Sequence, residues 1–188
     1  MTPPATATRL FLTVWLVYAA FLTTNVVRET YLAVAIGGDY AIRVDPYLGL
    51  HPDLFEIPER GGYINSNPGA SLLGAVPYLL ARPAIAGLFA IRPELAAPKP
   101  PTNYDDPRPN RTNFMNEMRA RGLDVRLALA AIVIQVGLMA PLGALAVLAL
   151  FGYLRARREA ESTALWLARL YAFATPLMFR SAFLNHNV

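Results

Sequence analysis

The longest apolar run in the chain, residues 127–154, contains no charged side chain and ends in the basic cluster Arg155-Ala156-Arg157-Arg158. About 20 apolar residues in a helix cross the core of a bilayer, so the run predicts a second membrane span with length to spare. Pro141 and Gly143 interrupt it, and neighbouring helices can supply the hydrogen-bond partners that such residues remove from a backbone in lipid. Because Lys and Arg beside a span stay in the cytoplasm, we place the basic cluster there.

An apolar run of similar length lies near the N-terminus, at residues 10–27, directly after Arg9. It is longer than the apolar core of a signal peptide, and no cleavage site of small residues follows it. We therefore expect residues 1–27 to hold a cytoplasmic N-terminus and a retained first span.

The third apolar run begins after the basic turn at residues 155–163 and occupies most of residues 164–188. We expect it to cross to the extracytoplasmic side. Arg169 lies early enough for its side chain to reach back to the cytoplasmic interface, and Pro176 predicts a kink.

Residues 28–126, between the first and second spans, predict a large extracytoplasmic loop. Gly37-Gly38 should end any extension of the first helix, and three prolines within residues 43–63 argue against long regular elements. Residues 93–109 are rich in proline and predict an irregular segment, whereas residues 113–126 predict a short amphipathic helix that leads into the second span.

One apolar stretch in this loop, residues 70–91, is ambiguous. A count of Lys and Arg favours a further span, since that would place the basic residues of 92–126 inside. Against this, Arg82 falls near its middle between Pro77 and the adjacent Pro83, and an Arg at mid-bilayer costs about 2.5–3.5 kcal/mol. The broken pattern favours helices that lie at the membrane interface, which is the arrangement we expect.

The composition agrees with an all-α integral membrane protein of three transmembrane helices and a large extracytoplasmic loop carrying interfacial helices. Apolar residues make up 55% of the 188 positions and charged residues 16%, and the chain has no Cys. The net charge of +4 comes from residues near helix ends, so we expect no nucleic-acid partner. The bacterial inner membrane, with the loop outside the cytoplasm, is the expected location.

With this topology, polar side chains from the loop and from both outer helix ends meet at the extracytoplasmic face. Carboxylates there can act as a general base, arginines can clamp a phosphate, and histidines with acids can hold a divalent metal. The simpler alternative is that these charges solvate the loop and pair with one another. The candidates are Glu29, Asp39 and Asp45 as the base, Arg28, Arg180, Asn185 and His186 as phosphate or substrate ligands, and His51 with Asp53 as weaker metal ligands.

Four short motifs in this order resemble the N-terminal part of the GT-C superfamily. They are Arg28-Glu29-Thr30-Tyr31, Gly38-Asp39-Tyr40, Asn67-Pro68-Gly69 and Ala174-Thr175-Pro176. Members of that superfamily are membrane glycosyltransferases that use polyprenyl-phosphate sugars, among them the protein O-mannosyltransferases and aminoarabinose transferases. The resemblance implies juxtamembrane helices over residues 70–91.

The resemblance also implies an acidic pair at the end of the first helix, whose first acid is taken as the catalytic base. Arg28 occupies that place and cannot accept a proton. Glu29 then remains, with Asp39 or Asp45 as substitutes, while Arg28 or Arg180 would bind the carrier phosphate.

Two functions follow as hypotheses. The first is the N-terminal module of a GT-C-like glycosyltransferase, active only if completed by further helices, so we expect no transfer by these 188 residues alone. The second is a non-catalytic accessory subunit of a larger membrane complex, for example a bioenergetic or photosynthetic assembly, derived from such an enzyme. A transporter is disfavoured because the spans carry few ionisable groups.

Overall fold

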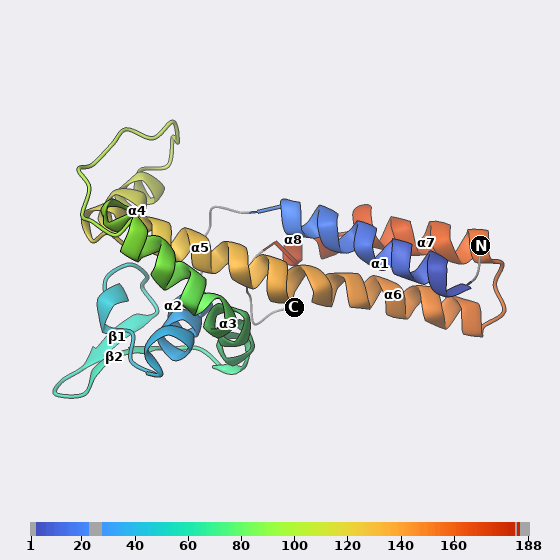
Figure 1. The fold of residues 1–188 in the computed structure, drawn as a ribbon, viewed down its shortest axis with the longest axis horizontal. Coiled ribbons are helices and arrows are strands. Elements are labelled where there is room, and N and C mark those ends of the chain that lie inside the picture. Colours follow the sequence, from blue (N-terminus) through green and yellow to red (C-terminus); the bar gives the residue numbers. More distant parts are fainter. Residues whose placement is uncertain (1–2, 23–27, 183, 185–188) are drawn as a thin grey trace. The chain divides into compact units, whose positions relative to one another are not determined.

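The computed structural model describes residues 3–22, 28–182 and 184, and divides into two compact units (Figure 1). Unit 1 comprises Met1–Asn25 and Ile132–Val188, and unit 2 comprises Val26–Ala131. The described residues are mostly helical, as expected. The elements of unit 1 are α1 (Pro3–Ala20), the π-helical turn η4 (Gln135–Met139), α6 (Ala140–Ala156), α7 (Glu161–Phe173) and α8 (Leu177–Arg180).

The core of unit 1 combines alanines with a few larger buried side chains such as Tyr18 and Phe151, while several other large apolar side chains are exposed. Leu16 on α1 is 63% exposed and Trp166 on α7 is 60% exposed, although both are strongly apolar. Small residues let helices approach closely where lipid, rather than water, surrounds them. The packed positions include alanines four residues apart, which are Ala140 and Ala144 on α6 and Ala164, Ala168 and Ala172 on α7.

Side chains from one helix satisfy backbone groups of another at the π-helical turn. The indole Nε1 of Trp15 on α1 donates a hydrogen bond to the carbonyl oxygen of Val136 at 3.0 Å. Val136 lies five residues before Pro141, which has no N–H to donate. The expectation that a neighbouring helix supplies the missing partner is thus confirmed. In return, Gln135 Nε2 donates to the carbonyl of Tyr18 at 2.8 Å, near the end of α1.

The backbone carbonyls at the end of α7 also receive hydrogen bonds from groups outside the helix. The last carbonyls of a helix have no partner within it, and here three of them accept bonds from other groups. The pairs are Ala174 N to Leu170 O at 2.8 Å, Thr175 Oγ1 to Tyr171 O at 2.6 Å and Tyr18 Oη to Ala172 O at 2.7 Å.

Two expected helix boundaries in unit 1 are corrected. The first helix ends at Ala20, short of residue 27, and residues 23–27 lie outside the described part. The third ends at Phe173, and the separate short helix α8 follows Pro176, so this proline interrupts the helix instead of kinking it. A residue before proline is disfavoured from helical geometry, which explains the break at Thr175.

Unit 2 is built around two packed helical segments (Figure 1). Its elements are α2 (Arg28–Val34), the π-helical turn η1 (Ala35–Asp39), the 3₁₀ turns η2 (Asp45–Tyr47) and η3 (Pro93–Leu95), the strands β1 (Leu54–Ile57) and β2 (Gly61–Ile64), and the helices α3 (Gly69–Ile91), α4 (Pro109–Ala120) and α5 (Asp124–Ile134). The helix does end after Gly37-Gly38, with Tyr40 in the left-handed conformation. A Cβ on Gly37 would lie 2.8 Å from the carbonyl oxygen of Ala75, so glycine permits the close approach of η1 to α3.

A small antiparallel hairpin departs from the all-α expectation. Leu54 pairs with Ile64 and Ile57 with Gly61, and Gly61 has φ +99°, a conformation that glycine adopts readily. The sequence analysis missed these strands because each is only four residues long.

The amphipathic helix expected over residues 113–126 is also corrected. α4 starts at Pro109 and ends at Ala120, and Gly122 follows with φ +66°. A Cβ at Gly122 would lie 2.2 Å from the carbonyl oxygen of Ala96, so this glycine separates α4 from α5. The Pro-rich segment 93–109 is irregular apart from η3 and its last residue, Pro109, which begins α4.

Two helices in the described part are long and apolar enough to cross a membrane, namely α3 and the continuous helix Asp124–Ala156 formed by α5, η4 and α6. Ala5–Ala20 is apolar but shorter. By length and composition, these helices point to association with a membrane.

Candidate functional site

The structure brings four of the predicted site residues together at the start of α2, in what we call the Arg28 cluster: Arg28, Glu29, His51 and Asp53. Arg28 Nε lies 3.2 Å from Glu29 Oε1, and Arg28 Nη1 bonds to Asp53 Oδ2. Asp53 and His51 lie just before β1, so the ion pairs tie the hairpin to α2. Glu29 is buried, only 3% exposed.

His51 is held neutral within this cluster. Its Nδ1 accepts a hydrogen bond from the backbone N–H of Asp53 at 3.1 Å, which leaves the ring proton on Nε2. Burial, together with the positive charge of Arg28, lowers the pKa of His51, and Glu29 opposes the shift. With Nδ1 occupied, the ring can donate from Nε2 but is a poor proton acceptor.

The Arg28 cluster is therefore better suited to hold the loop than to perform chemistry. The carboxylates of Glu29 and Asp53 both neutralise Arg28, and Glu29 has little access to solvent. Among the described residues, no group of three or more His, Asp or Glu side chains could hold a metal ion, although His51 and Asp53 do lie 3.7 Å apart.

Asp45 supports the hairpin. Its Oδ1 accepts a hydrogen bond from the backbone N–H of Gly62 at 2.5 Å, and its Oδ2 lies 3.5 Å from Arg43 Nε. Both oxygens of Asp45 are thus engaged near the hairpin.

A second group, which we call the Asp39 cluster, consists of Asp39, Arg82 and Arg126 around the phenol rings of Tyr47 and Tyr78. Burial is the main cause that raises the pKa of Tyr47, and Asp39 adds to this shift while Arg126 opposes it. Tyr78 lies within electrostatic range of Arg126, Asp39 and Arg82. These three charged side chains therefore share one neighbourhood in unit 2.

Aromatic rings hold the two arginines of the Asp39 cluster. The Arg82 guanidinium lies 5.1 Å from the ring centre of Tyr40, the neighbour of Asp39 in sequence, and Arg126 lies 5.7 Å from that of Phe89. Cation–π contacts of this kind orient a guanidinium and leave its N–H donors available.

Apart from these cation–π contacts, the charged side chains of the Asp39 cluster are available for further hydrogen bonds. Within the described part of the chain, Asp39, Arg82 and Arg126 make no hydrogen bond or ion pair through their side chains, and Asp39 is exposed. An accessible carboxylate can accept a proton, and two guanidinium groups can bind a phosphate in fork geometry.

The predicted base candidates are not brought together. Glu29 and Asp39 lie at opposite ends of the helical segment formed by α2 and η1, roughly 15 Å apart along the axis at 1.5 Å per residue. Arg180 is exposed at the end of α8 in unit 1, and Asn185 and His186 lie outside the described residues.

Sequence reasoning did not assign a binding role to Arg82 or Arg126. Arg82 was treated as an obstacle to insertion and Arg126 as one basic residue in a count. For Arg82 a signal did exist, because an isolated charge in an apolar stretch is a functional candidate by default. Arg126 follows several other charged residues and carries no such signal.

Comparison of the chain with protein-family models, curated proteins and solved structures finds no match.

Proposed function

We propose that the chain is an integral protein of the bacterial inner membrane in which α1, the helix Asp124–Ala156 and the region from α7 onward cross the bilayer. The exposed apolar side chains and the alanine core of unit 1 support this proposal. A helical unit in water would bury its Leu and Trp side chains and expose the smaller ones.

In the proposed topology α3 lies along the outer membrane surface. Arg121 Nη1 donates hydrogen bonds to the carbonyl of Leu48 at 2.7 Å and to that of Pro46 at 3.3 Å. These residues flank α3 in sequence, and a helix of 23 residues is roughly 34 Å long, enough to cross the membrane core. If α3 crossed the bilayer, Arg121 and Leu48 would lie on opposite faces, so their contact favours a surface helix.

The activity we propose is that of a GT-C-like glycosyltransferase module, completed by further helices, that uses a polyprenyl-phosphate sugar. An acceptor hydroxyl oxygen attacks the anomeric carbon, its proton passes to a carboxylate, and the bond from that carbon to the phosphate oxygen breaks. The leaving group is the polyprenyl phosphate, whose negative charge requires cationic partners.

The Asp39 cluster is the observation that carries this proposal. Asp39 takes the role of base, because it is exposed and unengaged whereas Glu29 is buried beside Arg28. Arg82 and Arg126 take the role of phosphate ligands that was first given to Arg28 and Arg180. Arg126 lies near the start of the helix Asp124–Ala156, which is the outer end of the span in the proposed topology.

The alternative proposal is a non-catalytic subunit of a larger membrane complex. It is favoured by Arg28, which stands where the resembled family carries its acid and is paired with both Glu29 and Asp53. The wide apolar exposure of unit 1 would then serve protein contacts in addition to lipid contacts.

Binding of a short-chain polyprenyl monophosphate to the full chain in lipid nanodiscs tests the enzyme proposal. Arg126→Gln should weaken binding by about tenfold or more, since hydrogen bonds to charged groups contribute about 1.5–3 kcal/mol. Arg60→Gln is the matched control, because Arg60 is exposed and has no ion pair within the described residues.

Absence of binding by the unchanged protein, or equal binding by Arg126→Gln, would contradict the phosphate role. Isolation of the chain in a stoichiometric larger complex that binds no polyprenyl phosphate would support the subunit proposal instead.

A further inference from the structure

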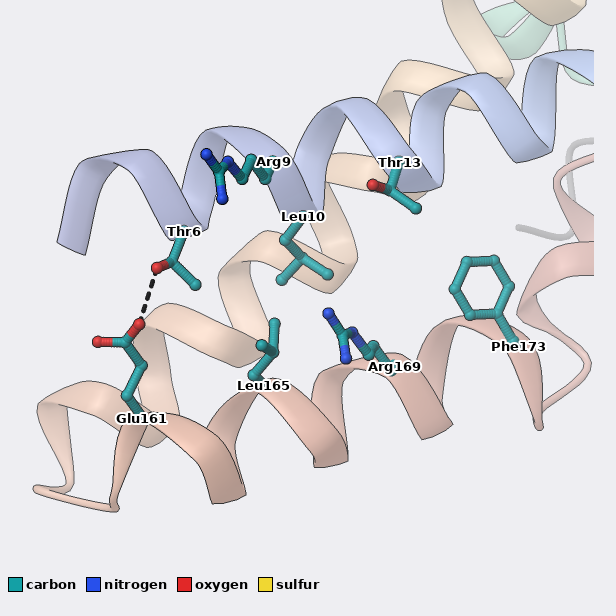
Figure 2. A pocket seen from close by; sticks show the side chains of 8 residues that line it. All are labelled: Thr6, Arg9, Leu10, Thr13, Glu161, Leu165, Arg169 and Phe173. Atoms are coloured by element: carbon teal, nitrogen blue, oxygen red, sulfur yellow. Dashed lines mark hydrogen bonds between the residues drawn. The ribbon is translucent and has the colours of Figure 1, made fainter. Parts of the chain in front are cut away.

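A groove between α1 and α7 in unit 1 has the composition of a ligand site (Figure 2). Its volume is about 270 Å³, far more than a single water molecule needs. Polar side chains from both helices line it together with apolar ones. Those that matter here are Thr6, Arg9 and Leu10 from α1, and Glu161, Leu165 and Arg169 from α7.

The charge of the groove favours an anion. It contains two guanidinium groups, on Arg9 and Arg169, and one carboxylate, on Glu161. The Glu161 carboxylate is already engaged, since Thr6 Oγ1 donates a hydrogen bond to its Oε1 at 2.7 Å. The lining side chains therefore carry a net formal charge of +1.

Arg169 is the side chain best placed to bind an anion in this groove. Figure 2 shows it reaching from α7 toward α1, beside Leu10 and Leu165. It makes no hydrogen bond or ion pair within the part of the chain that the structure describes. Because an arginine in a membrane helix is costly unless it is paired or reaches water, a bound anion would stabilise this position.

The remaining lining is apolar. Leu10 and Leu165 lie beside the arginines, and Phe173 lies farther along, at the C-terminal end of α7 (Figure 2). The groove thus places cationic hydrogen-bond donors next to an apolar surface. This combination suits an amphiphile with an anionic headgroup better than a free anion.

The surrounding charge indicates which amphiphile. Arg155 in the last turn of α6 and Arg157 and Arg158 in the turn that follows are exposed, so this end of unit 1 is basic. Basic ends face the cytoplasm, whose leaflet carries anionic lipids, and basic pockets between helices on that side bind their headgroups.

We infer that the groove between α1 and α7 binds the phosphate headgroup of an anionic phospholipid from the cytoplasmic leaflet, with Arg9 and Arg169 as its ligands and an acyl chain along Leu10, Leu165 and Phe173. The inference rests on the proposed membrane placement of unit 1. It is independent of the phosphate role proposed for Arg82 and Arg126.

Native mass spectrometry of the full chain tests this inference, after exchange into detergent with equal amounts of phosphatidylglycerol and phosphatidylcholine. The unchanged protein should retain phosphatidylglycerol preferentially. Arg169→Gln should reduce that retention by about tenfold or more, the loss expected when charge-assisted bonds to a phosphate are removed. Arg157→Gln, an equal loss of charge outside the groove, should leave retention unchanged.

Two further variants make the test specific. Glu161→Gln removes the carboxylate that opposes an anion and should increase phosphatidylglycerol retention. Arg169→Lys keeps the positive charge but loses the bidentate guanidinium geometry, so its retention should be intermediate. Unchanged helix content of each variant by circular dichroism shows that it folds.

Equal retention by Arg169→Gln and the unchanged protein would overturn the inference, as would equal loss in Arg157→Gln. Competition by millimolar inorganic phosphate that empties the groove would assign it to a soluble anion and overturn the lipid assignment. Arg126→Gln serves as the reference for the other proposal, because it should affect polyprenyl phosphate binding without affecting phosphatidylglycerol retention.

Discussion

Replacement of Tyr18 by Phe should destabilise unit 1 through a single hydrogen bond. The phenol is completely buried and donates to the Ala172 carbonyl at 2.7 Å, while its ring meets Phe173 edge-on at 6.2 Å. Tyr18→Phe keeps the ring and removes only the hydroxyl. Because α7 ends at Phe173, the Ala172 carbonyl has no partner within the helix.

The cost can be bounded from both sides. An unpaired buried acceptor costs about 1–3 kcal/mol, whereas hydrogen bonds between membrane helices average about 0.6 and reach about 1.7 kcal/mol. Tyr18 belongs at the upper end, because its acceptor is a helix-end carbonyl and the Tyr18 side chain is completely buried. We expect a loss of about 1–2 kcal/mol, a factor of roughly 5–30 in the ratio of folded to unfolded protein.

Unfolding in mixed micelles of a mild detergent and dodecyl sulfate measures this loss, with tryptophan fluorescence as the signal. Trp15 lies in the same packed region as Tyr18 and should report its opening. Tyr153→Phe is the matched control, because its phenol is 61% exposed and has no hydrogen bond in the described part of the chain. Equal stability of Tyr18→Phe and Tyr153→Phe would refute the reasoning.

Three predictions concern unit 2. Gly122→Ala should lower its thermal stability by more than about 1 kcal/mol, because a Cβ strains the left-handed backbone and overlaps the Ala96 carbonyl oxygen. Gly87→Ala, where a Cβ meets open space on a helix, should be neutral or stabilising by up to about 1 kcal/mol, and the reverse order in a melting experiment would contradict both. The lowered pKa of His51 means that the folded state resists its protonation, so stability should fall as the pH drops below about 6.5. His51→Asn should flatten this part of the profile, and a profile that stays unchanged would show that another group is responsible.

The sequence predicts the long helices well, because their apolar runs are longer than those of a short helix in a protein core. The run at residues 127–154 appears within the helix Asp124–Ala156, and the partner expected near Pro141 is Trp15. The end of α7 could also have been predicted from Pro176, since a residue before proline avoids helical geometry. The end of α1 at Ala20 was not, because the group that caps it, Gln135, is distant in sequence.

The candidate site was predicted only in part. The Arg28 cluster joins residues that the sequence also predicts as candidates, and their burial and ion pairing favour a structural role. Asp39 was chosen as well, whereas its proximity to Arg82 and Arg126 depends on how α3 and α5 pack within unit 2. Local patterns contain no information about such contacts between segments far apart in the chain.

The central claim is that α3 does not cross the bilayer. Asp39 and Arg126 can share a site only if the chain between them stays on one side of the membrane. The chain contains no Cys, so single cysteines at the exposed positions Arg60, Asp105 and Arg157 can be labelled in intact cells with a membrane-impermeant maleimide. We expect Arg60→Cys and Asp105→Cys to react and Arg157→Cys to be protected until the membrane is opened. Reaction of Arg60→Cys together with Arg157→Cys, but not Asp105→Cys, would mean that α3 crosses the bilayer and would contradict the account.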